Sequence, residues 1–204
     1  KELSRLKLVS GDLTEAIRLT EHVCRLDPHD DISRVELAKL YWQNGENVKA
    51  LEFLQDFTRH RRLSPEVGKA FFLFAEIQAD TGQLDAAHQT LELLLAIGTT
   101  TVEQHEVFER QGDLFMEAGL PDEALASYRS ARERGAKSPR ISTRIGEALL
   151  ASGKVEECLK EVNSVDPDLL LPAEWYDLLC LQARAHIERG EVQSARQLVH
   201  KAVS

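Results

Sequence analysis

Apolar and polar residues along the chain follow the period of amphipathic helices. Apolar residues recur three or four positions apart, and no stretch alternates strictly between apolar and polar as a half-buried strand does. Prolines and polar clusters such as "LDPHD" (26–30) and "KSPR" (137–140) separate these stretches. The pattern predicts helices and no strands, over the ranges 2–10, 13–26, 31–44, 47–60, 65–81, 84–97, 101–118, 121–134, 139–152, 155–164, 172–189 and 192–203.

Glycines divide the predicted helices into pairs. They follow the first helix of each pair at positions 11, 45, 82, 119, 153 and 190, at intervals of 34, 37, 37, 34 and 37 residues. A glycine that ends a helix commonly adopts the left-handed conformation, which costs other residues about 1–2 kcal/mol. We therefore expect each glycine to form a tight turn between two antiparallel helices.

Small side chains occur at fixed distances from these glycines. Seven residues before them lie Ser4, Ala38, Ala75, Gly112, Gly146 and Ala183, and five residues after them lie Ala16, Ala50, Ala87, Ala124, Cys158 and Ala195. Nine residues after them, the side chain is apolar in five of six cases: Thr20, Leu54, Leu91, Tyr128, Val162 and Val199. The spacing predicts that paired helices approach closely at the small residues, and that the larger residue packs over this contact.

This spacing resembles the tetratricopeptide repeat, a 34-residue helix–turn–helix unit. The best match is "VFERQGDLFMEAGLPDEALASYRSA", where the matching positions are Gly112, Phe115, Gly119, Ala124, Tyr128 and Ala131. The second repeat matches at Leu37, Ala38, Tyr41, Gly45 and Ala50, whereas the tryptophan that the family carries at its fourth position is absent throughout.

The resemblance implies an all-α fold, a right-handed α-solenoid of stacked antiparallel helix pairs. We expect a single repeat domain over 1–204, with repeats at about 1–29, 30–63, 64–99, 100–137, 138–170 and 171–204. The short first repeat suggests a piece of a longer array.

The resemblance also implies a partner-binding concave face lined by the first helix of each pair. The candidate residues are Val35, Lys39, Trp42, Phe72, Glu76, Glu109, Asp113, Met116, Glu147, Arg184 and Ile187. Their carboxylates, together with Glu117, predict an acidic stripe that could hold a basic amphipathic segment. Two alternatives stay open: the charges form a solvated helix face, and Trp42 packs between repeats.

Three consecutive leucines, 169–171, interrupt the helical pattern in a long connection between repeats. Either they tuck under the last repeat, or they form an exposed docking patch.

Composition narrows the class of partner. The net charge is −9, from 34 acidic and 25 basic residues, which disfavours nucleic acid and an RNA-binding role. No apolar run of 18 or more residues occurs, so we expect no membrane insertion of this segment. Three cysteines in helical patterns argue against a disulfide framework and against zinc, which favours the cytoplasm and leaves the periplasm open.

Motifs for catalysis are missing from the sequence. Seven histidines are scattered, "HEVFE" (105–109) lacks the second histidine of a zinc-protease helix, and no phosphate-binding loop or nucleophile elbow occurs. We therefore expect a protein–protein interaction scaffold that is not an enzyme and needs no cofactor. The alternatives are a scaffold of an envelope machine (exopolysaccharide export or outer-membrane assembly), and a targeting module of an enzyme whose catalytic domain lies outside this chain.

Overall fold

The computed structural model describes residues 12–59, 66–98 and 102–203, which form helices joined by short connections. The chain divides into two compact units, Lys1–Glu103 and Gln104–Ser204. No strand occurs in the described ranges, so the expected all-α class is confirmed for them. The predicted helix 2–10, together with Ser4 and Gly11, lies outside the described residues.

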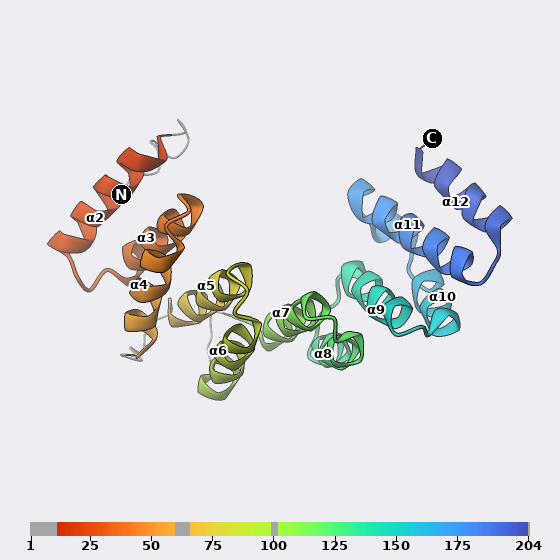
Figure 1. Cartoon of the computed structure of the whole chain (residues 1–204), viewed down its shortest axis with the longest axis horizontal. Coiled ribbons are helices and arrows are strands. Elements are labelled where there is room, and N and C mark those ends of the chain that lie inside the picture. Colours follow the sequence, from red (N-terminus) through yellow and green to blue (C-terminus); the bar gives the residue numbers. More distant parts are fainter. Residues whose placement is uncertain (1–11, 60–65, 99–101, 204) are drawn as a thin grey trace. The chain divides into compact units, whose positions relative to one another are not determined.

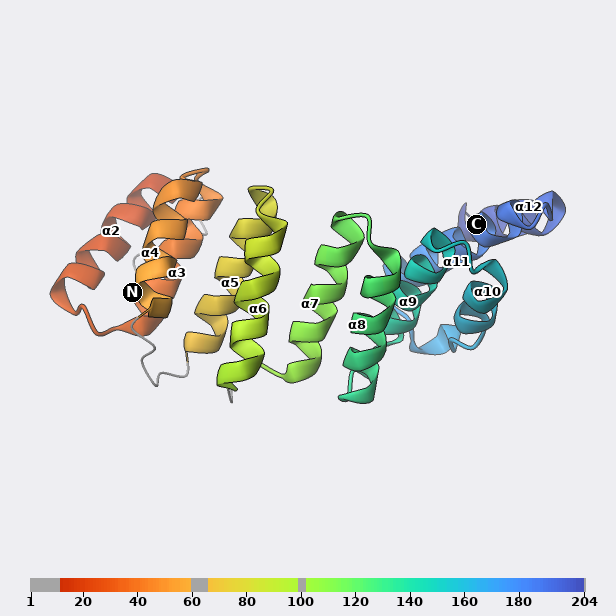
Figure 2. The same cartoon turned by 60° about the horizontal axis from the view of Figure 1, so that its bottom comes forward.

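The helices of each unit pack in consecutive pairs. The first unit contains α2 (Leu13–Leu26), α3 (Asp31–Gln43), α4 (Asn47–Arg59), α5 (Val67–Asp80) and α6 (Leu84–Ile97). The second contains α7 (Gln104–Glu117), α8 (Pro121–Glu133), α9 (Pro139–Ala151), α10 (Val155–Asn163), the 3₁₀ turn η1 (Pro167–Leu169), α11 (Pro172–Glu188) and α12 (Val192–Val203). The pairs α3–α4, α5–α6, α7–α8, α9–α10 and α11–α12 each lie side by side (Figures 1 and 2).

Most helix boundaries lie within one residue of the prediction, because local capping groups mark them. The Asp12 carboxylate accepts a hydrogen bond from the backbone of Glu15, and Pro121 occupies the first turn of α8. The largest difference is α7, which begins at Gln104 instead of 101. The β-branched Val102 forms a bend before it, and such residues start helices poorly.

Of the six predicted turn glycines, five lie in the described residues, and all five form the expected turn. Gly119 has a φ of 72°, and its N–H donates to the Met116 carbonyl while the next N–H, of Leu120, donates to the Phe115 carbonyl. The other four turns repeat both hydrogen bonds, with φ between 72° and 80° at Gly45, Gly82, Gly153 and Gly190. A Cβ at these glycines would meet no atom within 4 Å, so the backbone conformation selects glycine here.

The close approach of paired helices is also confirmed. A Cβ built at Gly112 would overlap the ring of Tyr128, and one built at Gly146 would lie 2.6 Å from Val162 Cγ1. Both contacts join the residue seven before a turn glycine to the residue nine after it. The small residues five after the described glycines are 0–3% exposed: Ala50, Ala87, Ala124, Cys158 and Ala195.

The last pair departs from this pattern at Val199. This side chain is 50% exposed, whereas Leu54, Leu91 and Val162 at the equivalent position are at most 1% exposed. In the preceding pair, Leu181 of α11 approaches the surroundings of Gly146 together with Val162. The predicted packing of the residue nine after the glycine therefore holds for Leu54, Leu91 and Val162, whereas Val199 is only half covered.

Successive repeats of the second unit are joined by ion pairs whose acids occupy equivalent positions. Lys154, directly after a turn glycine, lies 2.7 Å from the Asp122 carboxylate in the first turn of α8. Arg189, directly before the next turn glycine, lies 3.2 Å from the Glu156 carboxylate in the first turn of α10. Each acid stands three residues after its own glycine. The exposure of these pairs makes their contribution to stability small, so we assign them a role in orienting neighbouring repeats.

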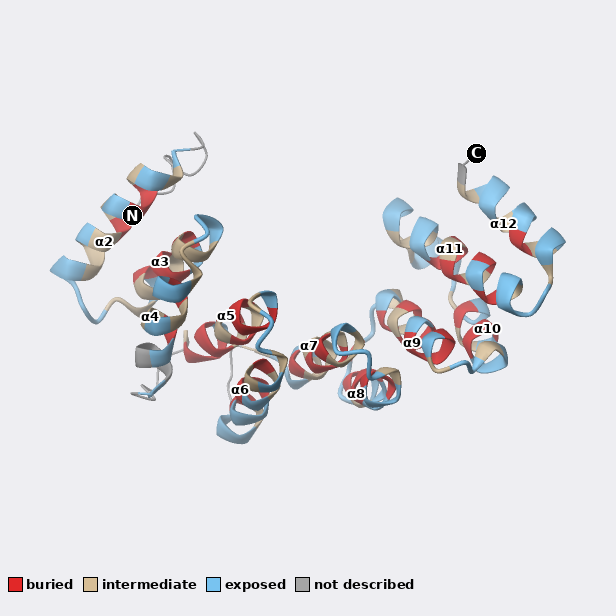
Figure 3. Ribbon diagram, viewed as in Figure 1, coloured by how far each residue is buried: buried red, intermediate tan, exposed pale blue. Residues whose placement is uncertain are grey.

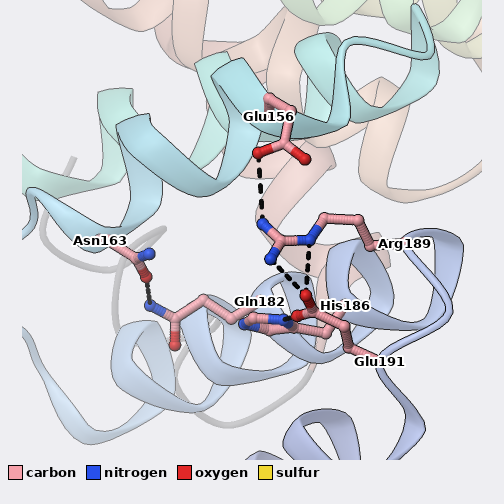
Figure 4. A network of polar contacts seen from close by, with 6 residues as sticks. All are labelled: Glu156, Asn163, Gln182, His186, Arg189 and Glu191. Atoms are coloured by element: carbon pink, nitrogen blue, oxygen red, sulfur yellow. Dashed lines mark hydrogen bonds and ion pairs between the residues drawn. The ribbon is translucent and has the colours of Figure 1, made fainter.

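The network around Arg189 extends into the turn before α12 (Figure 4). Arg189 also pairs with Glu191, whose carboxylate lies 2.7 Å from His186 Nδ1. The hydrogen bonds from His186 and Arg189 lower the pKa of Glu191 below its ordinary value. Beside this network, the Gln182 amide donates to Asn163 at the end of α10, over 2.9 Å. The last pair is thereby held to α10 by polar contacts as well as by its core.

Buried residues lie on the sides of the helices that face neighbouring helices, and exposed residues lie mainly on the other sides (Figure 3). In the second unit one core cluster joins α8 to α11, and its members include Tyr128, Ile145 and Leu181. The three consecutive leucines differ in burial. Leu170 is partly buried against this cluster, whereas Leu169 and Leu171 are 68% and 67% exposed.

We expect Gly112→Ala to lower the free energy of unfolding by about 1–3 kcal/mol, because its methyl group would overlap the Tyr128 ring. In a Tyr128→Leu background the same substitution should cost nothing or stabilise by up to about 1 kcal/mol, since alanine favours helix. The chain already uses this combination at Ala38 with Leu54 and at Ala75 with Leu91. Urea unfolding of the four members of this double-mutant cycle measures the coupling, and additive effects would contradict the contact.

The cysteines should differ in reactivity. Burial raises the pKa of the Cys158 thiol to about 11, and the residue is 0% exposed. Cys24 and Cys180 are partly exposed. We expect a thiol reagent such as Ellman's reagent to modify Cys158 only when the chain unfolds, in step with the urea transition. Rapid labelling of a Cys24→Ser, Cys180→Ser variant under native conditions would show this expectation to be wrong.

Candidate partner-binding face

The second unit presents its candidate residues on the first helices of its pairs. Glu109 and Asp113 project from α7 with side chains 24% exposed, and Glu147 on α9 is exposed. On α11, Arg184 is exposed and Ile187 is 57% exposed. Met116 on α7 is only partly exposed, because it packs against the core cluster.

Arg144 of α9 pairs with both carboxylates of α7. Its guanidinium lies 3.1 Å from Asp113 Oδ2 and 3.4 Å from Glu109 Oε2, and its side chain is only 16% exposed. The Tyr128 hydroxyl donates to Asp113 Oδ1 over 2.8 Å. These acids therefore form a paired, partly buried network, so this part of the expected stripe carries little unbalanced negative charge.

A second arginine reinforces this balance from within α7. Arg110 lies 3.5 Å from a Glu117 carboxylate oxygen and 4.0 Å from Asp113. Sequence reasoning considered neither Arg110 nor Arg144. One signal was available, because both stand nine residues before a turn glycine and so occupy the same place in successive repeats.

Desolvation and neighbouring charges shift two pKa values on this face. Burial raises the pKa of Tyr128, and the nearby Asp113 charge adds to this effect, so the hydroxyl remains a hydrogen-bond donor at neutral pH. The pKa of Glu147 is also raised, by partial desolvation and by Asp177, against the opposing attraction of Arg184. The face thus combines carboxylates of one first helix with arginines from the first helix of the next pair.

The remaining candidates lie in the first unit, on α3 and α5, which pack together. Lys39 is exposed, while Val35, Trp42, Phe72 and Glu76 are partly buried. Trp42 is thus neither fully packed nor fully exposed. Their role in binding a partner stays a prediction, as it does for the candidates of the second unit.

The described part of the chain contains neither a metal-binding cluster nor a membrane-spanning helix. No group of three or more histidine, cysteine or acidic side chains gathers there in a way that could hold a metal ion. No helix among these residues is long and apolar enough to cross a bilayer. The arrangement offers hydrogen bonds, charges and apolar contacts, which are the means of binding.

Comparison with known families identifies the family to which the chain belongs. A family model described as tetratricopeptide repeat matches residues 8–70 and 115–180, which is more than half of the chain. The chain belongs to the tetratricopeptide repeat family. As a tetratricopeptide repeat protein it has a fold that supports protein–protein interaction in general. No curated protein sequence matches it.

Solved structures share this tetratricopeptide fold along nearly the whole chain. A tetratricopeptide repeat protein from Parabacteroides merdae has a TM-score of 0.78 and 16% identity, over 99% of this chain and 77% of that chain. The type IV pilus biogenesis factor PilW has a TM-score of 0.76 and 14% identity, over 98% and 89%. The repeats of a putative kinesin light chain from Podosopora anserina have a TM-score of 0.70 and 22% identity, over 83% and 91%. At these identities the likeness establishes the fold.

We expect Arg144→Met to lower the free energy of unfolding by about 1–3 kcal/mol, because it leaves two partly buried carboxylates without their cation. Arg129→Met is the matched control, since Arg129 pairs with Glu157 at 3.6 Å with both side chains about half exposed. Its loss should stay below about 0.5 kcal/mol. Equal losses in thermal or urea unfolding would show that the Arg144 network does not stabilise the unit.

Proposed function

We propose that this tetratricopeptide repeat chain is a non-catalytic scaffold that binds a segment of a partner protein along α9 and α11. The observation that supports this proposal is the succession of charges across the first helices of the second unit. Glu109 and Asp113 lie against Arg144, and Glu147 lies near Arg184. These three acids thus face an arginine of the following first helix.

Such a face suits a segment of mixed charge. Arg144 already pairs with the carboxylates of Glu109 and Asp113. Glu147 and Asp177 are therefore the acids that we expect to meet a basic group of the partner. Arg184 would pair with a carboxylate of the partner, and Ile187 would contribute an apolar contact. The basic partner expected from the sequence therefore meets a balanced surface, and we propose a partner segment that carries both signs of charge.

The test removes only exposed side chains. The partner is first captured by a photo-crosslinking amino acid at position 187, identified, and purified for calorimetric titration. The triple variant Glu147→Ala, Arg184→Ala, Ile187→Ser should weaken binding at least tenfold, because these side chains form the centre of the proposed contact. A matched triple variant on second helices, Glu133→Ala, Lys160→Ala, Val192→Ser, should change the dissociation constant less than twofold.

Two results would contradict the proposal. If both triple variants weakened partner binding equally, or if only the second-helix variant weakened it, the contact would not lie on α9 and α11. Failure to crosslink any protein that also binds in purified form would remove the scaffold function for this face. Thermal unfolding of each variant shows whether a loss of binding reflects a loss of fold.

An envelope machine is the second candidate setting. The similarity to PilW, a type IV pilus biogenesis factor, agrees with this setting, although the two share only 14% identity. Fractionation of cells that produce the full-length protein tests it, and recovery in the cytosol alone would exclude it. The sequence that flanks this chain tests the remaining alternative, a targeting module of an enzyme.

A further inference from the structure

The connection between α10 and α11 exposes two leucines that the proposed function does not use. Leu169 and Leu171 are 68% and 67% exposed, whereas Leu170 between them is partly buried against the core cluster. The backbone is extended at Leu170 and Leu171, with ψ angles of 142° and 155°, and successive side chains of an extended chain point to opposite sides. The contact of Leu170 with the core therefore turns its two neighbours towards solvent.

Backbone hydrogen bonds and prolines stabilise the conformation of this connection. The N–H groups of Leu169 and Leu170 donate to the carbonyls of Asp166 and Pro167, and each bond is 3.2 Å long. Pro167 begins η1 and Pro172 begins α11, and the proline ring restricts φ at both places. A surface that is ordered before binding loses less conformational entropy when a partner binds. The two exposed leucines are thus a preformed apolar contact.

Carboxylates lie at both ends of the three leucines. Asp166 Oδ1 accepts a hydrogen bond from the Asp168 N–H over 3.0 Å, directly before Leu169. Glu174 Oε2 accepts a hydrogen bond from the Leu171 N–H, also over 3.0 Å, at the start of α11. These two hydrogen bonds hold negative charge beside the exposed apolar side chains.

The acids of this connection are not balanced by nearby basic residues. Between Lys160 and Arg184 the sequence contains five acids and no lysine, arginine or histidine. Among the described residues, no cation forms an ion pair with Asp166, Asp168 or Glu174. The acids of the candidate face on α7 differ in this respect, because an arginine of the following first helix pairs with them.

The cations that neighbouring helices bring to this region are engaged by other groups. Arg132 of α8 lies 2.6 Å from the Glu161 carboxylate of α10. The Lys201 ammonium of α12 lies 5.4 Å from the centroid of the Trp175 ring. Even when Lys201 is counted, the three carboxylates around the leucines outnumber it. The charge beside the exposed leucines therefore complements a basic partner.

We infer that Leu169 and Leu171 form a docking site for a segment of a partner protein in which a bulky apolar side chain is flanked by basic residues. The apolar side chain of the partner contacts the two leucines, and its lysines or arginines pair with Asp166 and Glu174. This site goes beyond the proposed function, because it lies on the connection between α10 and α11 and selects a partner segment of one charge sign.

The test uses the 204-residue chain labelled with ¹⁵N and two pools of blocked hexapeptides. Each peptide has Phe or Leu at its centre, flanked by Lys in one pool and by Glu in the other. The Lys pool should produce saturable amide shifts at Asp168, Leu169 and Leu171, and it should bind at least fivefold more tightly than the Glu pool. Raising the salt concentration to about 0.5 M should weaken this binding, because salt screens exposed charges.

The apolar contact is tested by Leu169→Ser, Leu171→Ser, which should weaken binding of the Lys pool at least fivefold. Leu93→Ser, Ile97→Ser is the matched control, because these side chains are 48% and 37% exposed on α6 of the other unit. The control should leave binding within twofold. The ¹⁵N spectrum of each variant shows whether the fold is kept.

The charges are tested by Asp166→Asn, Glu174→Gln, which should weaken binding of the Lys pool at least threefold. Both new side chains keep an oxygen that accepts the backbone hydrogen bond, so the variant removes charge with little change in the connection. Asp85→Asn, Glu92→Gln makes the same change at exposed positions of α6 and should leave binding within twofold.

Three outcomes would overturn the inference: equal or tighter binding of the Glu pool, no saturable shift with the Lys pool up to millimolar concentration, or unchanged binding in Leu169→Ser, Leu171→Ser. The triple variant Glu147→Ala, Arg184→Ala, Ile187→Ser should leave these shifts unchanged, and their loss there would place the peptides on the face of the proposed function instead. A failure of either site is thereby separated from a failure of the other.

Discussion

The close contact between the two helices of a pair is the constraint on which the rest of the structure depends. At Gly112 there is no room for a Cβ beside the Tyr128 ring, and at Gly146 none beside Val162. The short turn that joins these helices requires the left-handed backbone, which glycine adopts at low cost. The same constraint places the larger side chain where the next pair can cover it, as Leu181 covers the surroundings of Gly146.

Stability and orientation come from different interactions. Apolar side chains between helices are almost wholly buried, and burial at about 25 cal/mol per Å² makes them the main source of stability. The pairs Lys154–Asp122 and Arg189–Glu156 are exposed and contribute little energy, but their acids recur at equivalent positions.

The sequence predicted the fold well because its signals are local. The periodicity of apolar residues, the helix caps and the turn glycines each depend on residues within one helix or one helical hairpin. Helix ranges and the pairing of Gly112 with Tyr128 therefore follow from the spacing of residues in the sequence. The candidate face was predicted less completely. Whether Arg144 reaches Glu109 and Asp113 depends on how one repeat is rotated against the previous one, and that rotation is set by packing across the whole interface.

Net charge is therefore a poor guide to the partners of this chain. The value of −9 suggested a basic partner, but arginines of following first helices balance acids on the candidate face of the second unit. Part of the acidic excess lies instead at exposed positions of second helices, such as Glu123, Glu133 and Glu157. Exposed charges of this kind are screened within about 8 Å at physiological salt, whereas partly buried groups such as Arg144 are screened much less. Selectivity for a partner should consequently follow the local arrangement of a few partly buried side chains.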